Sequence, residues 1–193
     1  MTNDSFFRSS GYLQDGVVID TAGRPRRIAE LPPFLRTLLV ADGTVTKALE
    51  AYFWEPVDVR QLVQRLEQPA APVAGLAHAP EEPLLYREVS LDGAHSGRCY
   101  ALARSHLALE NLPGHFAQAI VDGKMGIGEL LREQGVETYR DIIELNYHPR
   151  ETAADARLQA LEDDVISRAY RISVSGVPAI LVTEYFPIGC YAA

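Results

Sequence analysis

The chain has 193 residues, of which 47% are hydrophobic and 23% are charged, and its formal net charge is −8. This length and composition predict one globular domain, and the negative charge argues against a surface that binds nucleic acid or anionic membranes. No apolar run is long enough to span a bilayer, and the first residues lack the basic and apolar regions of a secretion signal. We therefore expect a cytoplasmic protein with no nucleic acid and no membrane among its partners, whose oligomeric state the sequence leaves open.

The connection between two predicted helices, here called the elbow, contains more polar residues than a turn requires. Apolar positions repeat at helical spacing over residues 33–41, after a proline pair that suits a first helical turn. Asp42-Gly43 ends this helix, and Thr44 is a suitable N-cap for a second helix over residues 46–53. A bare connection needs only Asp-Gly, so the added polar residues raise the question of whether the elbow also covers a ligand.

Two β-hairpins are the clearest prediction in the rest of the chain. Their strands show alternating apolar positions on either side of short turns, and they are expected at residues 84–91 with 98–109 and at residues 167–174 with 178–186. Residues 56–66 favour a further strand, and the proline-rich residues 68–83 predict a surface loop. Short helices are expected around residues 111–122 and after the glycine-rich stretch 123–128. Residues 136–164 are mixed, with an acidic helical part near the end.

Hairpin strands and short helices together predict an α+β fold with an antiparallel sheet, because the βαβ alternation of dinucleotide-binding folds is missing. Residues 1–30 are polar and turn-rich, and we expect them to pack as an extension on a single domain formed by residues 31–193. The only cysteines, Cys99 and Cys190, lie far apart in sequence, which fits a reducing compartment better than a disulfide framework.

Three charged residues lie on largely apolar faces of the predicted strands. Because side chains alternate between faces along a strand, Glu184 falls among isoleucine, valine and phenylalanine, Arg87 among leucine and valine, and Arg104 beside a tyrosine and a leucine. One interpretation is a structural ion pair with the third charge at a rim. The other is a pocket in which two guanidiniums bind carboxylates and a glutamate, kept protonated by burial, donates to a ligand oxygen. Such a set suits a dianionic ligand that carries a hydroxyl.

Gly126 and Gly128 precede a predicted helix and free backbone N–H groups that can bind an anion. Their spacing matches neither a phosphate-binding loop nor GxGxxG, and a tight turn explains it equally well. No metal site is predicted, because the five histidines are scattered and neither HExxH nor paired cysteines occur. A GxSxG nucleophile elbow is also missing. We expect no metal and no cofactor.

Several short segments, taken in order, resemble the chorismate pyruvate-lyase family, in particular its short bacterial members formerly grouped as a domain of unknown function. The resemblance covers most of the chain, from about Pro32 to Phe186. It rests on the order and spacing of DGTVTKALE, LLYREVSL, ALARSHLAL, GKMGIGELLRE and RAYRISVSGVPAILVTEYF. It implies an antiparallel sheet of about six strands whose helical flaps enclose an internal ligand site.

The resemblance also implies roles for individual residues. Arg87 and Glu184 would be the catalytic residues that hold the two ends of an aromatic product, and Arg104 would occupy a secondary anion-binding position. The other expected members of the site are the backbone of Ile127 beside the product carboxylate, its neighbours Gly126 and Gly128, and Val45 with Thr46 on the flap. Enterobacterial-type members have Pro-Leu-Gly at positions 126–128 and methionine at position 45, so this chain differs at both the glycine elbow and the flap.

The implied function is elimination of pyruvate from chorismate to give 4-hydroxybenzoate, with only small molecules as partners. The ring becomes aromatic, so positioning matters more than a strong base. Two routes stay open: the ring C4 hydrogen passes directly to the enolpyruvyl methylene in a cyclic step, or Glu184 assists departure as a general acid. The alternatives are a non-catalytic effector-binding module of the same fold and a chorismate-using enzyme that yields another hydroxybenzoate. The sequence does not indicate the downstream pathway.

Overall fold

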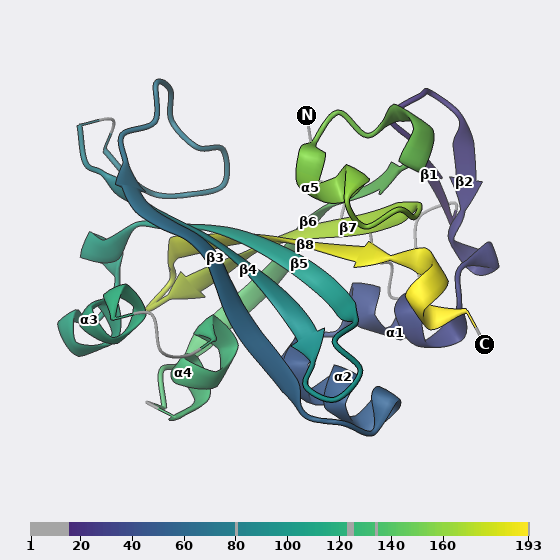
Figure 1. Cartoon of the computed structure of the whole chain (residues 1–193). Helices are drawn as coiled ribbons and strands as arrows, with labels where there is room; N and C mark the ends of the chain where they lie inside the picture. Colours follow the sequence, from purple (N-terminus) through teal and green to yellow (C-terminus); the bar gives the residue numbers. More distant parts are fainter. Residues whose placement is uncertain (1–15, 80, 123–125, 134, 193) are drawn as a thin grey trace.

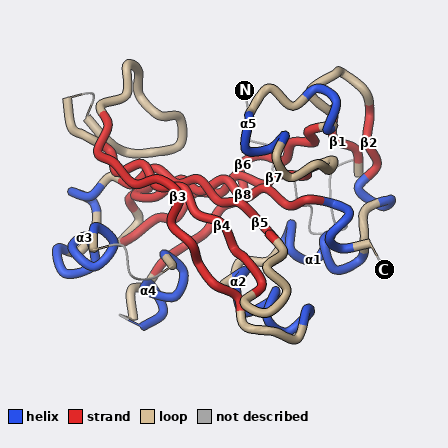
Figure 2. Tube along the Cα trace, in the orientation of Figure 1, coloured by secondary structure: helices blue, strands red, loops and turns tan. Residues whose placement is uncertain are grey.

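The computed structural model describes residues 16–79, 81–122, 126–133 and 135–192. At its centre lies a six-stranded antiparallel sheet in the order β3-β4-β5-β8-β7-β6. The strands are β3 Val57–Glu67, β4 Leu84–Gly93, β5 Cys99–Leu107, β6 Thr138–His148, β7 Val165–Val174 and β8 Val177–Pro187. Figure 2 shows these strands in the middle of the molecule, with helices and loops at its periphery. The predicted α+β class and its antiparallel sheet are confirmed.

Short helices cover the sheet. They are α1 Pro33–Val40, α2 Val45–Phe53, α3 Gly114–Val121, α4 Ile127–Glu133 and α5 Ala156–Gln159, with 3-10 turns at Ile28–Glu30, Leu109–Asn111, Arg150–Thr152 and Ile188–Tyr191. In Figure 1, α1 and α2 lie below the sheet, as do α3 and α4, whereas α5 lies above it. The helix–elbow–helix unit and the helix after the glycine-rich stretch form where the sequence predicts them, on the same side of the sheet.

The main difference from the sequence prediction is β6. Residues 138–148 form a strand of 11 residues, although residues 136–164 predict a mixed segment with an acidic helix. The strand lies at the sheet edge, and its pairing with β7 shifts between Ile142 and Glu144. The shift adds a residue to β6 and interrupts the two-residue alternation by which strands are recognised. Only the four-residue α5 remains of the acidic helix, and it begins after Asp155, whose side chain accepts two backbone N–H groups.

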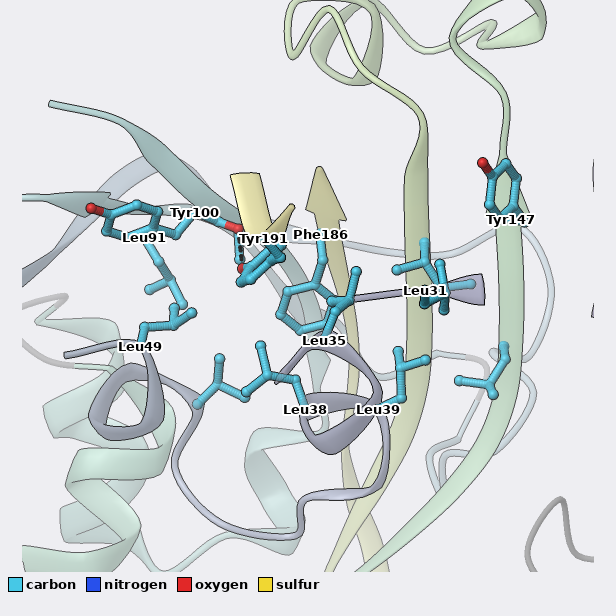
Figure 3. Packing of buried hydrophobic residues seen from close by; sticks show 14 of the residues in the cluster. Leu31, Leu35, Leu38, Leu39, Leu49, Leu91, Tyr100, Tyr147, Phe186 and Tyr191 are labelled. Atoms are coloured by element: carbon cyan, nitrogen blue, oxygen red, sulfur yellow. Dashed lines mark hydrogen bonds between the residues drawn. The ribbon is translucent and has the colours of Figure 1, made fainter. Parts of the chain in front are cut away.

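Within the described residues the apolar core has three clusters. A small one joins Leu158 of α5 to Leu102 and Val165, and two larger ones lie on the lower side of the sheet. One cluster packs α1 and α2 against the strands, and Figure 3 shows Leu35 and Leu38 of α1 below Phe186 of β8. The other packs α3 and α4 against the far ends of the strands and includes the fully buried Phe116. Burial of one such side chain stabilises the fold by about 1.5–3 kcal/mol. The partly buried Ile142 contacts both of these clusters and so connects them.

A small hairpin precedes the helices, formed by β1 Val17–Ile19 and β2 Pro25–Arg27. It lies beside β6, where Asp20 forms an isolated bridge with Tyr147. Residues 1–15 lie outside the described residues, so the predicted division into an extension and a domain stays a prediction. Within the described part of the chain, no helix is both long and apolar enough to cross a bilayer.

Candidate functional site

The space between the two larger core clusters is a cavity under the sheet, bordered by the elbow before α2 and by the start of α4. Its volume is about 80 Å³, several times the roughly 10–15 Å³ that a cavity needs to hold one water molecule. All six strands contribute to its wall. Apolar side chains line much of it, and its charged residues are Arg87, Glu129, Arg140 and Glu184. A small apolar cavity with a few polar groups is the usual form of a small-molecule site.

Arg87 is brought to the cavity by β4. It alternates with Val89 and Leu91 on the same face of the strand, and its exposed fraction is only 2%. Burial lowers the pKa of the Arg87 guanidinium below its usual value, yet an arginine of this kind stays protonated at neutral pH. A buried cation that faces a cavity favours an anionic ligand, because a carboxylate replaces the hydration that burial has removed.

Glu184 reaches the same cavity from β8, where it forms a buried ion pair. Its carboxylate accepts hydrogen bonds from Nε of Arg168 at 2.8 Å and from the Tyr170 hydroxyl at 3.1 Å. Both partners lie on β7, and Arg168 is directly opposite Glu184 in the register. Within the protein the Glu184 carboxylate thus accepts hydrogen bonds beside a cation, and its role toward a ligand stays a prediction.

The same arginine connects the ion pair to the helical elbow. Nη1 of Arg168 donates to the carbonyl oxygens of Leu38 and Ala41, the second at 2.6 Å. These carbonyls lie at the end of α1, where backbone acceptors lack the i+4 partners of the helix interior, although the Leu38 carbonyl also accepts the Ala41 N–H at 3.3 Å. Although burial opposes its charge, the nearby Glu184 carboxylate raises the pKa of the Arg168 guanidinium. The positions of Glu184 and of the elbow are thus coupled through one side chain.

Both loop segments that the sequence assigns to the site line the cavity. Val45 and Thr46 belong to the first turn of α2 and border it from one side, with Val45 only 5% exposed. Gly126, Ile127 and Gly128, at the start of α4, border it from the other side. The elbow is therefore part of the wall of an internal space. The contacts that these residues make with a ligand stay predictions.

Arg104 does not belong to this cavity. Its neighbour Ser105 lines the cavity, and adjacent residues of a strand point to opposite faces. On the upper face, the Arg104 guanidinium binds Glu88 at 2.6 Å and Asp155 at 2.7 Å. Arg104 therefore does not share the cavity with Arg87 and Glu184, and carboxylates of the protein balance its cation. Its role in a secondary anion-binding position stays a prediction.

Two arginines of the site are missing from the sequence prediction. Arg168 lies in the predicted strand 167–174 and shares a face with Tyr170. The alternation of side chains along this strand could therefore have identified it as a charged residue on the same face as Tyr170. Arg140 lines the cavity from β6, and it was missed because β6 itself was not predicted. The structure thus replaces Arg104 by Arg140 as the second arginine that faces the cavity.

The described residues form no group of three or more histidine, cysteine, aspartate or glutamate side chains that could hold a metal ion. Both cysteines are free thiols. Burial, with a smaller contribution from Asp92, raises the pKa of Cys99 to about 12, which makes this thiol a poor nucleophile. The polar side chains that line the cavity are its arginines, its carboxylates and the hydroxyls of Thr44, Thr46, Ser105 and Tyr170.

A family model described as chorismate pyruvate-lyase, Rv2949c-like, matches residues 39–192. The chain belongs to this family. The match includes every residue that lines the cavity, and it confirms the resemblance found in the sequence. Membership of the Rv2949c-like family also fits the six-stranded sheet and its internal site.

Individual relatives agree with this assignment, and solved structures share the fold. Chorismate pyruvate-lyase of Mycobacterium leprae is 28% identical over 160 residues, which are 82% of this chain and 76% of that protein. Chorismate pyruvate-lyase of Mycobacterium tuberculosis H37Rv is 24% identical over 167 residues, 83% of each chain. PhnF from Mycobacterium smegmatis superposes with a TM-score of 0.59 at 16% identity, over 77% of this chain and 65% of that one. Its effector domain alone gives 0.55 at 15% identity, over 77% and 90%. At such identities the solved structures show a shared fold only.

Proposed function

We propose that the protein eliminates pyruvate from chorismate and releases 4-hydroxybenzoate. The observation that carries this proposal is that Arg87 and Glu184, each almost completely buried, face one cavity from different strands. 4-Hydroxybenzoate carries a carboxylate at one end of its ring and a hydroxyl at the other, and these groups require a cation and an acceptor. Membership of the Rv2949c-like family and the names of the mycobacterial relatives support the same substrate.

In this proposal each end of the ring has its own partner. Arg87, together with the backbone of Ile127, binds the ring carboxylate, and Glu184 accepts a hydrogen bond from the ring hydroxyl. The chain carries a net charge of −8, so its overall field repels a dianion and the attraction must be local. Arg87 and Arg140 supply that attraction at the cavity wall. Arg168, which does not line the cavity, balances the charge of Glu184.

The reaction requires positioning more than strong catalytic groups. The C3–O bond of chorismate breaks, C4 loses its hydrogen, and the ring becomes aromatic. The enolpyruvyl fragment gains a hydrogen at its methylene carbon and leaves as pyruvate. In the cyclic route the C4 hydrogen itself makes this transfer, so no side chain has to hold a proton. A Glu184 whose two oxygens already accept hydrogen bonds suits this route better than general acid catalysis.

A module that binds an aromatic carboxylate without chemistry is the second candidate. The fold is shared with the effector domain of PhnF and with the ligand-binding domain of a GntR-family regulator from Bordetella bronchiseptica, the latter at a TM-score of 0.52. Both functions would use the same cavity, so the fold does not separate them. They differ in whether chorismate is consumed.

The test is to incubate the purified protein with chorismate, separate the aromatic products by chromatography and assay pyruvate independently. We expect equal amounts of 4-hydroxybenzoate and pyruvate without added metal or cofactor, and no activity in the Arg87→Ala variant. Formation of 3-hydroxybenzoate would identify a different chorismate-using enzyme. Tight binding of 4-hydroxybenzoate without turnover would favour the effector-binding module. Activity that a chelator removes and a divalent ion restores would contradict the metal-free expectation.

A further inference from the structure

We propose that Arg140 binds the second carboxylate of the substrate, which belongs to the enolpyruvyl group, and so makes the site selective for dianions. This inference rests on the proposed function. Chorismate carries two carboxylates and a hydroxyl, whereas Arg87 and Glu184 together account for one carboxylate and the hydroxyl. The second carboxylate therefore needs a cation of its own, and one lines the same cavity.

The position of Arg140 fits this role. It extends into the cavity from β6, where it lies opposite Ile172 of β7. Its guanidinium carbon is 5.8 Å from the centre of the Tyr170 ring, and the Tyr170 hydroxyl donates to Glu184. Arg140 thus lies near the end of the cavity where the ring hydroxyl is proposed to bind. In chorismate the enolpyruvyl ether is on the ring carbon beside the one that bears this hydroxyl, so its carboxylate lies near the same end.

The protein uses only part of the Arg140 guanidinium. Nη1 donates to the carbonyl oxygens of Asp42 and Gly43, both at 2.7 Å. A guanidinium has five N–H donors. Within the described residues, no hydrogen bond uses Nε or Nη2 of Arg140, and no carboxylate lies within ion-pair distance of it. The edge formed by Nε and Nη2 has the fork geometry that binds a carboxylate through two parallel hydrogen bonds.

A threonine and a glycine complete this part of the wall. Thr44 was expected to cap α2, but its side chain makes no capping hydrogen bond, and it lines the cavity instead. A Cβ built on Gly128 would lie 3.4 Å from Oγ1 of Thr44 and 3.6 Å from Nη2 of Arg140. The hydroxyl and the guanidinium therefore meet beside a residue without a side chain. This explains why the elbow carries a polar residue where Asp-Gly would suffice for a turn.

The arrangement distinguishes the substrate from the aromatic product. When the C3–O bond breaks, the second carboxylate leaves with pyruvate, and 4-hydroxybenzoate keeps only the carboxylate assigned to Arg87. Arg140 therefore strengthens the binding of chorismate without strengthening that of the aromatic product. Because its Nη1 also holds the carbonyls of Asp42 and Gly43, a carboxylate bound at Nη2 is connected to the elbow through one guanidinium.

Two stable ligands isolate the second carboxylate from the rest of the molecule. 3-(1-Carboxyethoxy)-4-hydroxybenzoate carries both carboxylates, and 3-ethoxy-4-hydroxybenzoate lacks the second. Their affinities would be measured by calorimetry for the wild type, Arg140→Gln, Arg140→Lys and Arg171→Gln. Arg171 is the matched control because it lies on the neighbouring strand, faces the other side of the sheet and binds Asp141 at 2.7 Å.

We expect Arg140→Gln to weaken the dicarboxylate on the order of 10- to 100-fold, the usual range for a charged hydrogen-bonded pair, and to leave the monocarboxylate nearly unchanged. Arg140→Lys should fall between the wild type and Arg140→Gln, and Arg171→Gln should bind both ligands normally. An equal loss for both ligands would overturn the inference and make Arg140 a structural clamp of the elbow.

The wild type alone provides a test that does not depend on the folding of a variant. If it binds the dicarboxylate no better than the monocarboxylate while it still converts chorismate, the inference fails and the proposed function stands. If it neither binds 4-hydroxybenzoate nor consumes chorismate, the proposed function fails, and the inference fails with it.

Discussion

The two faces of the sheet carry the same pair of residue types in the same register, yet only the pair on the lower face contributes a residue to the cavity beside α2 and α4. On the lower face, Arg168 of β7 lies opposite Glu184 of β8, with Nε and Oε2 2.8 Å apart. On the upper face, Arg104 of β5 lies opposite Glu88 of β4, with Nε and Oε1 2.6 Å apart. Glu88 also binds Arg157 from α5 at 2.8 Å, whereas Glu184 has no second arginine among the described residues.

The difference lies in how each face balances its charge. On the upper face, two arginines and two carboxylates form a closed network in which each charge has a partner from the protein. On the lower face, Arg168 balances Glu184, and the arginines Arg87 and Arg140 also face the cavity, where Glu129 is the other carboxylate. A buried ion pair by itself therefore does not identify a site. We infer that a local excess of positive charge beside a cavity marks a site, because a ligand anion can balance it.

The largest effect is expected when each pair loses its arginine. Arg168→Met leaves Glu184 buried without its cation and should lower the free energy of unfolding by about 3–5 kcal/mol. Arg104→Met should cost about 1–3 kcal/mol, because Glu88 keeps Arg157. Urea unfolding at pH 7 measures both values. The double variant Arg168→Met/Glu184→Met should recover much of the lost stability, since neither charge of the pair stays buried. A larger loss of stability for Arg104→Met than for Arg168→Met would contradict the expected order of the two faces.

The next effect concerns ligand affinity, which should depend on one face only. Arg87→Ala should weaken 4-hydroxybenzoate binding by about 2–5 kcal/mol, because a buried carboxylate would lose its cation. Arg87→Lys should cost less but remain measurable, since an ammonium lacks the planar fork of a guanidinium. The control is Arg104→Lys, which changes the same atoms on the opposite face. Equal dissociation constants of the Arg87→Lys and Arg104→Lys variants for 4-hydroxybenzoate would mean that Arg87 has a structural role only.

The sequence predicted the elements and the faces better than it predicted the cavity. Alternation within β4 and β8 was enough to place Arg87 and Glu184 on apolar faces, because both strands are long and regular. It could not show that Arg104 faces away from them, because the relation between faces of different strands depends on the pairing register. The position of Arg140 could not be predicted, because β6, an edge strand whose pairing with β7 shifts, was not recognised as a strand.

A third effect is the stabilisation of the folded protein by product. 4-Hydroxybenzoate at about 100 times its dissociation constant should raise the free energy of unfolding by roughly 2.7 kcal/mol, because it binds the folded chain only. Glu184→Gln should remove most of this gain, since an amide is a weaker acceptor than a carboxylate for the ring hydroxyl. Glu88→Gln makes the same change on the upper face and should keep the full gain. Thermal melts with and without ligand compare the variants, and equal shifts for both would place Glu184 outside the site.

The smallest effect is a pH dependence that belongs to the upper face. Burial alone would raise the pKa of Asp155, but hydrogen bonds from the Arg104 guanidinium and from the Arg157 backbone outweigh it, and the net pKa lies below its usual value. A carboxylate whose pKa is lowered by folding contributes stability above the pKa of the unfolded chain, near 3.9, and loses it as the pH falls through the folded value. Because the Asp155 side chain is still 33% exposed and solvent screens its charge, this contribution should be under about 1 kcal/mol.

Asp155→Asn tests this contribution while it keeps an oxygen that can cap α5. The variant should be slightly less stable than the wild type at pH 7, and the difference should shrink as the wild-type carboxylate is protonated below pH 4. Urea unfolding at pH 7 and at pH 3 measures this change. The shift in melting temperature caused by 4-hydroxybenzoate should be the same in both proteins, because Asp155 lies on the face without the cavity. A difference that is constant with pH would mean that the charge of Asp155 contributes nothing, and a reduced ligand shift would mean that the two faces are coupled through the sheet.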